Sequence, residues 1–242
     1  MREWPIIIAT LSSSLLFAIS FSAWNNSITV APVVYISILA LTVLLFILNY
    51  HRSSKRKKII FNFQTVPGVS EILIYVLFSI LSSIAILTGF EIFWILSFVS
   101  GFVMLVAIDT VYANSDKSYE IRYHNAQVFL TGLQLASFMI SEPLPFIFIS
   151  FIKTLYLLVF KIFRQVRTVQ KIFSIVYILY LVFVSYSLFN SISDLYFVKI
   201  LTLLLIFELG MRIIFYFDFT LSSNSFNLFY EKNKDIDEKE IN

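Results

Sequence analysis

Residues 72–108 read ILIYVLFSILSSIAILTGFEIFWILSFVSGFVMLVAI, and this stretch decides the fold class. It contains one charged side chain, Glu91, which follows the break at Gly89. A helix needs roughly 20 apolar residues to cross the hydrocarbon core of a bilayer. Every backbone N–H and C=O inside lipid must be paired within its own segment, so helices are the only option for these lengths. Two apolar runs joined by so short a break therefore predict antiparallel transmembrane helices at 70–89 and 91–112.

The same pattern recurs along the chain. The composition agrees with a lipid environment, because 59% of the residues are hydrophobic and only 14% are charged, against about 45–50% and 25% in soluble domains. We predict an all-α, polytopic membrane helix bundle of about eight transmembrane helices. The other six predicted helices are 5–24, 29–49, 124–141, 145–163, 172–190 and 196–218. The first apolar run is long for a signal peptide and has no clear cleavage site, so we expect it to be retained as a helix.

The predicted bundle covers residues 1–221, and residues 222–242 form a polar C-terminal tail of mixed charge. Such a composition predicts disorder. The fifth predicted helix is the least apolar, so we expect it to face the bundle interior rather than lipid. Its polar side chains are Asn125, Gln127, Thr131, Gln134 and Ser137.

Basic side chains gather in the loops on one side of the predicted bundle. The run that follows the second helix consists of Arg52, Lys55, Arg56, Lys57 and Lys58. Lys199 is the single basic residue on the opposite side. Since loops rich in Lys and Arg stay in the cytoplasm, this asymmetry predicts a cytoplasmic (inner) membrane protein with both termini cytoplasmic. The basic run either touches anionic lipid or docks a partner, and the two roles are compatible.

Ionisable residues within the predicted spans are candidates for function, because a charge at bilayer depth costs several kcal/mol. Glu208 and Arg212 lie four residues apart on one helix face, which predicts a structural ion pair. Lys153, midway along its helix, needs a partner or a long reach to the interface. Glu71 opens the third predicted helix, where a carboxylate is also favoured by the helix dipole. His51 directly follows the second helix on the same membrane side, so the two form a candidate pair for proton exchange.

Several classes of site are excluded by what the sequence lacks. There is no Cys and there are only two His, which removes disulfides, cysteine-ligated metals and thiol nucleophiles. The chain has no phosphate-binding loop, zinc-protease motif, dinucleotide fingerprint or nucleophile elbow. We predict no catalytic centre and no metal site in this chain, and no nucleic-acid partner.

Taken in order, several landmarks resemble those of the membrane-anchor subunit of the dimethyl sulfoxide reductase family. The resemblance spans nearly the whole chain and includes eight helices in this order. Its residues are Glu3-Trp4-Pro5-Ile6, His51, Ser70-Glu71-Ile72, Val111-Tyr112, Phe129-Leu130-Thr131 and the last-helix pattern Glu208-Leu-x-x-Arg212-x-x-Phe215-Tyr216.

The resemblance implies an anchor that holds an iron–sulfur electron-transfer subunit and a molybdopterin catalytic subunit at the membrane. Such an anchor binds a quinol, usually menaquinol, and passes its electrons to the iron–sulfur subunit. It carries no haem or metal itself. The family's quinol site maps onto His51 and Glu71. Quinol oxidation releases two protons, so proton acceptors must line that site.

Two other functions remain open at this point. The first is a small secondary transporter that uses Lys153, Glu208 and Arg212 as a polar path. The second is a structural anchor whose quinol site has decayed, because Arg52-Ser53-Ser54-Lys55 follows His51 where the family has Leu-Gly-Ser-Pro.

Overall fold

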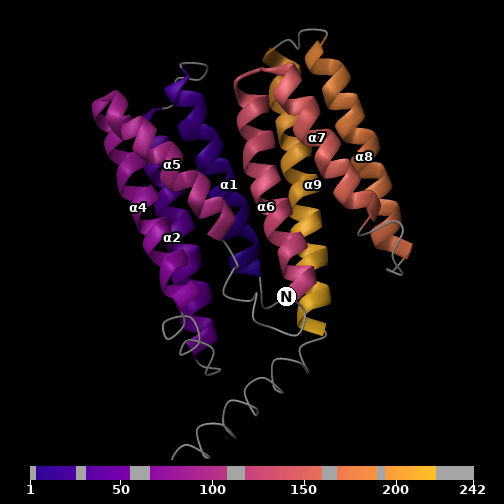
Figure 1. Ribbon diagram of the computed structural model, residues 1–242, viewed down its shortest axis with the longest axis horizontal. Coiled ribbons are helices and arrows are strands. Elements are labelled where there is room, and N and C mark those ends of the chain that lie inside the picture. Colours follow the sequence, from indigo (N-terminus) through magenta and orange to yellow (C-terminus); the bar gives the residue numbers. More distant parts are fainter. Residues whose placement is uncertain are drawn as a thin grey trace, which may run out of the picture.

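The computed structural model describes residues 4–25, 31–54, 66–107, 118–159, 168–189 and 194–221. These residues form eight α-helices and no strand (Figure 1), which confirms the all-α prediction. The helices are α1 (Trp4–Trp24), α2 (Pro32–Ser54), α4 (Val66–Thr88), α5 (Glu91–Ala107), α6 (Ser118–Met139), α7 (Pro143–Leu157), α8 (Thr168–Phe189) and α9 (Asp194–Leu221). The predicted tail 222–242 and the basic residues Lys55, Arg56, Lys57 and Lys58 lie outside the described residues.

Each predicted helix corresponds to one observed helix, but two boundaries change the setting of a candidate residue. Helix α2 continues to Ser54, so His51 lies within its last turn rather than after it. Helix α4 begins at Val66, and Pro67 fits its first turn because an N–H there has no partner within the helix. No acidic residue lies in that first turn. The explanation of Glu71 as a helix-start carboxylate is therefore wrong.

The helices form two neighbouring groups, α1, α2, α4 and α5 in one and α6 to α9 in the other (Figure 1). Helix α1 contacts all three other helices of its own group and also α6 and α9. Helix α6 contacts α7 and α9 in its own group and α1 and α5 in the other. Short connections at Gly89 and at Ser141, both with positive φ, turn α4 into α5 and α6 into α7. The seam between the groups is therefore built mainly from α1 and α6.

Close packing at the seam and within the first group depends on small residues. A Cβ built on Gly132 of α6 would overlap the side chain of Leu105 of α5, which is fully buried. A Cβ on Gly101 of α5 would crowd Phe17 of α1 and Phe78 of α4. Glycine at these positions lets the backbones approach closely, a feature of helix interfaces in membranes.

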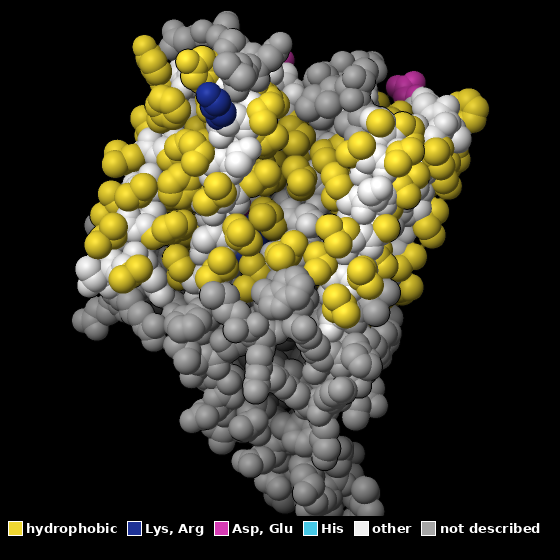
Figure 2. All heavy atoms as spheres, turned by 180° about the vertical axis from the view of Figure 1, so that it is seen from behind, with side chains coloured by type: hydrophobic (Ala, Val, Ile, Leu, Met, Phe, Trp, Pro, Cys, Tyr) yellow, Lys and Arg dark blue, Asp and Glu magenta, His cyan; other side chains and the backbone are white. Residues whose placement is uncertain are grey.

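Apolar side chains cover most of the described surface. Val33, Val169 and Tyr186 are each more than two-thirds exposed, and Figure 2 shows hydrophobic side chains spread over the described part of one face. Exposed apolar surface of this extent marks contact with lipid or another protein. Within the described residues, two helical segments are long and apolar enough to cross a membrane, Ile7–Trp24 and Thr168–Phe189. The first is about half buried and the second mostly exposed, in keeping with a central α1 and a peripheral α8.

The Gly132–Leu105 contact gives a test of the packing between α5 and α6. We expect Gly132→Ala to lower the free energy of unfolding by about 1–3 kcal/mol, because overpacking a filled site forces neighbours to move. Adding Leu105→Ala should recover part of that loss, so the double variant should be less destabilised than the sum of the two single variants. Thermal melting of the purified chain in detergent measures the three values. Strict additivity would contradict the contact.

Candidate functional site

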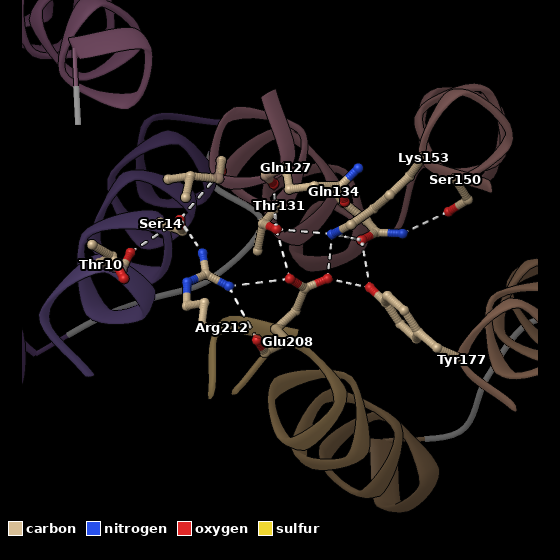
Figure 3. A network of polar contacts seen from close by, with 11 residues as sticks. Thr10, Ser14, Gln127, Thr131, Gln134, Ser150, Lys153, Tyr177, Glu208 and Arg212 are labelled. Atoms are coloured by element: carbon tan, nitrogen blue, oxygen red, sulfur yellow. Dashed lines mark hydrogen bonds and ion pairs between the residues drawn. The ribbon is translucent and has the colours of Figure 1, made fainter. Parts of the chain in front are cut away.

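A network of buried polar side chains lies where α6, α7, α8 and α9 meet, and Glu208 of α9 stands at its centre (Figure 3). One carboxylate oxygen, Oε1, accepts hydrogen bonds from Lys153 Nζ of α7 and from the Tyr177 hydroxyl of α8. The other oxygen, Oε2, accepts from Arg212 Nη1 at 3.1 Å and from the Thr131 hydroxyl of α6 at 2.7 Å. A single carboxylate thus joins four helices.

Lys153 is fully buried, and its ammonium group is completely engaged. Besides Glu208, it donates to Thr131 Oγ1 at 2.8 Å and to Gln134 Oε1 at 3.2 Å. An ammonium has three N–H donors, so these three acceptors use all of them. The network continues to Ser150 of α7, because the Gln134 amide donates to Ser150 Oγ at 2.8 Å. Lys153 Nζ also lies 5.6 Å from the centre of the Tyr177 ring, a favourable position for a cation.

Arg212 extends the network across the seam to α1. Its Nη2 donates to Ser14 Oγ at 3.2 Å, while Nη1 contacts Glu208 one turn earlier on α9. Ser14 also lies within hydrogen-bond distance of the Val128 carbonyl of α6, at 3.4 Å. Ser14 therefore connects α1 to both α6 and α9, so the polar network joins the two groups of helices.

Helical spacing explains why these side chains meet. Thr131 and Gln134 lie three residues apart on α6, and Ser150 and Lys153 lie three apart on α7, so each pair shares one face. Glu208 and Arg212 share a face of α9 in the same way. Helix α6 turns its polar face inward, since Gln127, Thr131, Gln134 and Ser137 are all buried. This confirms that the least apolar helix faces the interior. The side chain of Asn125 lies outside the described part.

Burying these charges is unfavourable unless they are paired. The side chains of Lys153, Glu208 and Arg212 are at most 3% exposed. Taking such groups out of water costs several kcal/mol per ion, which mutual attraction offsets only when hydrogen bonds also satisfy the remaining donors and lone pairs. Both oxygens of Glu208 and all three donors of Lys153 meet this condition.

The outcomes for the candidate residues differ. The ion pair that the spacing of Glu208 and Arg212 predicts is present, at 3.1 Å. Lys153 finds its partner in Glu208, so it does not need to reach the interface. Tyr177, Gln134 and Ser14 complete the network, and sequence alone did not connect them with it. Two features of the sequence pointed towards this network: the helical spacing of the polar residues on α6, and the need of Lys153 for a partner.

His51 and Glu71 belong to the other group of helices. They lie on α2 and α4, which contact each other, and their side chains are outside the described part, as is that of Arg52. Helical spacing places Tyr75 one turn beyond Glu71 on α4. The Tyr75 ring packs edge-on against Phe46 of α2, with 4.9 Å between ring centres. The helices that carry the candidate pair are thus neighbours with an aromatic contact between them.

Hydroxyl groups line the interior of this first group. Ser20 of α1 and Ser97 of α5 are hydrogen-bonded at 3.1 Å, and Thr42 of α2 is fully buried. Within the described parts of the chain, the buried hydroxyls of Tyr35 and Tyr75 have no hydrogen-bond partner. The two groups therefore differ in character: hydroxyls line the first, and charges are gathered in the second and at the seam.

Among the described residues, no three His, Cys, Asp or Glu side chains come together in a way that could hold a metal ion. Comparison with known proteins adds no relative, since no family model, no curated protein and no solved structure matches the chain at a significant level.

The central position of Glu208 predicts a ranking of variants. Glu208→Gln leaves two buried cations without a counter-charge, so we expect it to lower the free energy of unfolding by about 3–5 kcal/mol. Lys153→Met should cost less, because Glu208 keeps Arg212, Thr131 and Tyr177. Unfolding of the purified chain in detergent measures both, with Lys199→Met at an exposed position as the control. Equal losses for Glu208→Gln and Lys153→Met would contradict the assignment of Glu208 as the centre.

Proposed function

We propose that the chain crosses the inner membrane eight times and serves as the quinol-binding anchor subunit of a respiratory molybdenum oxidoreductase resembling dimethyl sulfoxide reductase. The observation that carries this proposal is the series of sequence landmarks from Glu3-Trp4-Pro5-Ile6 to Glu208 and Arg212, which follow one another in the family's order. The last pair of that series stands at the centre of the buried network.

Two structural features support eight spans. The described helices have apolar exteriors, and the start of α1 and the end of α9 lie at the same end of the bundle (Figure 1). Helices α5 and α7 have 17 and 15 described residues, and their predicted continuations, 108–112 and 160–163, lie outside the described part. An even number of spans would put both termini on the cytoplasmic side, as the basic loops predict.

The chemistry of the site follows from what quinol oxidation requires. The bound substrate, menaquinol or another quinol, gives up two electrons and two protons. His51 and Glu71 accept the protons, since a base near the working pH serves this step best. They sit on contacting helices, and Tyr75 and Phe46 provide aromatic contacts for a quinone ring one turn deeper. The electrons leave to the iron–sulfur partner.

The partners bind at the end of the bundle that carries the basic run. Arg52, Lys55, Arg56, Lys57 and Lys58 place a run of positive charge next to His51 in the sequence. An iron–sulfur subunit with an acidic face would dock there and bring its nearest cluster close to the quinol. The molybdopterin subunit binds through the iron–sulfur subunit and determines the terminal substrate.

A secondary transporter is the second candidate, and one observation favours it. Lys153, Glu208 and Arg212, which the sequence marked as a polar path, converge in one buried network beside the seam between the two groups. Ionisable residues inside a bundle are typical of ion and substrate pathways. This function would give substrate flux without any redox partner.

Purification of the tagged chain in mild detergent distinguishes the two candidates. The anchor function predicts co-purification of two further subunits, with iron and with molybdenum or tungsten, measured by mass spectrometry and metal analysis. A lone, metal-free polypeptide from membranes that express such enzymes would contradict the anchor and favour the transporter.

Quinol oxidation by the purified complex then tests the two site residues. We expect His51→Ala and Glu71→Gln each to lower the rate at least about tenfold, because each removes a proton acceptor. Matched controls are His124→Ala and Glu91→Gln, the latter exposed at the start of α5. An intact complex whose rate is unchanged in His51→Ala and Glu71→Gln would indicate an anchor with a decayed quinol site.

A further inference from the structure

The two groups of helices share one arrangement. Each consists of four consecutive helices, and a proline begins the second helix of each, Pro32 in α2 and Pro143 in α7. The first helices of the groups, α1 and α6, contact each other and run in the same direction (Figure 1). Each of them also contacts the last helix of the other group, α1 with α9 and α6 with α5. Such reciprocal contacts are those of two equivalent units around a two-fold axis between α1 and α6.

The burial pattern gives the register between the second and third helices of the groups. In each of these helices, three buried residues are spaced four and then three positions apart. They are Tyr35, Leu39 and Thr42 in α2, and Phe146, Ser150 and Lys153 in α7. They are Phe78, Ser82 and Ala85 in α4, and Tyr177, Leu181 and Val184 in α8. Lys153 is therefore equivalent to Thr42, and Tyr177 to Phe78.

The first helices match in the same way. Ser13, Ser14, Leu16 and Phe17 of α1 are buried. The same spacing of buried residues recurs in α6 as Gln127, Val128, Leu130 and Thr131. Ser14 Oγ lies 3.4 Å from the Val128 carbonyl oxygen, so two equivalent residues meet across the seam, as expected beside a two-fold axis.

The last helices complete the correspondence. Ser97, Gly101 and Leu105 of α5 are buried at intervals of one turn, as are Leu204, Glu208 and Arg212 of α9. Gly101 is therefore equivalent to Glu208, and Leu105 to Arg212.

The centres of the two groups occupy equivalent places with opposite chemistry. In the second group, Glu208 accepts hydrogen bonds from Thr131 and Tyr177. In the first group, the equivalent Gly101 lies against the equivalent side chains, Phe17 and Phe78. A Cβ built on Gly101 would come within 2.8 Å of each of these two rings. The contacts thus agree with the register that burial gives, and an apolar centre holds the same arrangement of helices.

We propose that the two groups are copies of one four-helix unit, and that the charged centre of the second copy is a site of function added to that unit. Well-packed apolar residues often replace a buried ion pair without loss of stability, and the first copy contains such a centre. Ionisable residues that a membrane bundle does not need for folding belong to its function. In an anchor that oxidises quinol, the charged species to be handled is the proton. This functional part rests on the proposed function, whereas the duplication does not.

Transplanting the first centre into the second copy tests the proposal on the full chain in detergent. The variant combines substitutions to the residues of the equivalent positions, namely Thr131→Phe, Lys153→Thr, Tyr177→Phe, Glu208→Gly and Arg212→Leu. We expect its melting temperature to lie within about 5 °C of the native value, because no charge stays buried without a partner. The matched control carries the same five residues with two exchanged, Thr131→Gly and Glu208→Phe. It should melt at least about 10 °C below the native chain, because the ring and the gap are in the wrong places.

The folded transplant then serves to remove the charged centre alone. We expect the purified complex that contains it to lose most of its quinol oxidation, although His51 and Glu71 are unchanged. Lys199→Gln, at an exposed position, is the control and should keep the native rate. A native chain that oxidises no quinol would contradict the anchor function, and the melting temperatures would still decide on the duplication.

Two results would overturn the proposal. A transplant that melts as low as its exchanged control would show that the second group does not share the packing of the first. A folded transplant that oxidises quinol at the native rate would show that the charged centre has no part in function.

Discussion

The carboxylate of Glu208 is the interaction on which the second group of helices depends. It accepts hydrogen bonds from α6, α7 and α8 and from its own helix, and through Arg212 it is linked to Ser14 of α1. A shared carboxylate sets the rotation of each helix about its axis, because any turn away from the centre would leave a charge without its partner.

The first group of helices is held in another way. Its interior contains hydroxyl groups and aromatic rings, and its helices approach closely where Gly101 faces Phe17 and Phe78. Many of its hydroxyls bond to carbonyls of their own helix, as Ser13 does to Ala9 and Thr42 to Ile38. Such local bonds satisfy the side chain without fixing a neighbour. Packing therefore determines the first group, whereas directed charge pairs determine the second.

Much of this architecture could be predicted from apolar run lengths. The eight helices and their order follow from where polar residues interrupt the sequence, since lipid tolerates no unpaired backbone. The inward polar face of α6 and the pairing of Glu208 with Arg212 follow from helical spacing. The start of α4 at Val66 could not be predicted in this way. Pro67 looks like the boundary of a helix in the sequence, although the first turn of a helix accommodates a proline.

The partners of Lys153 show where sequence reasoning stops. Spacing relates residues of one helix, but it does not say which helices are neighbours or how each is rotated. Tyr177 and Gln134 joined the network only when the packing of α6, α7 and α8 was known. The candidate pair His51 and Glu71 shows the converse, since the helices that carry it are in contact while its side chains lie outside the described part. The assignment of His51 and Glu71 to a quinol site therefore depends on the family resemblance of the sequence.

The distance in sequence between partners has a consequence for how the protein is made. Lys153 lies on α7, but its counter-charge lies on α9, and the Ser14 partner of Arg212 lies on α1. A ribosome delivers these helices in order, so α7 leaves the ribosome with its ammonium group before the carboxylate has been synthesised. Helix α1 must likewise wait for the last helix to complete its contacts. The arrival of α9 therefore closes the bundle, and a chain that ends before it would bury the ammonium group of Lys153 without its counter-charge.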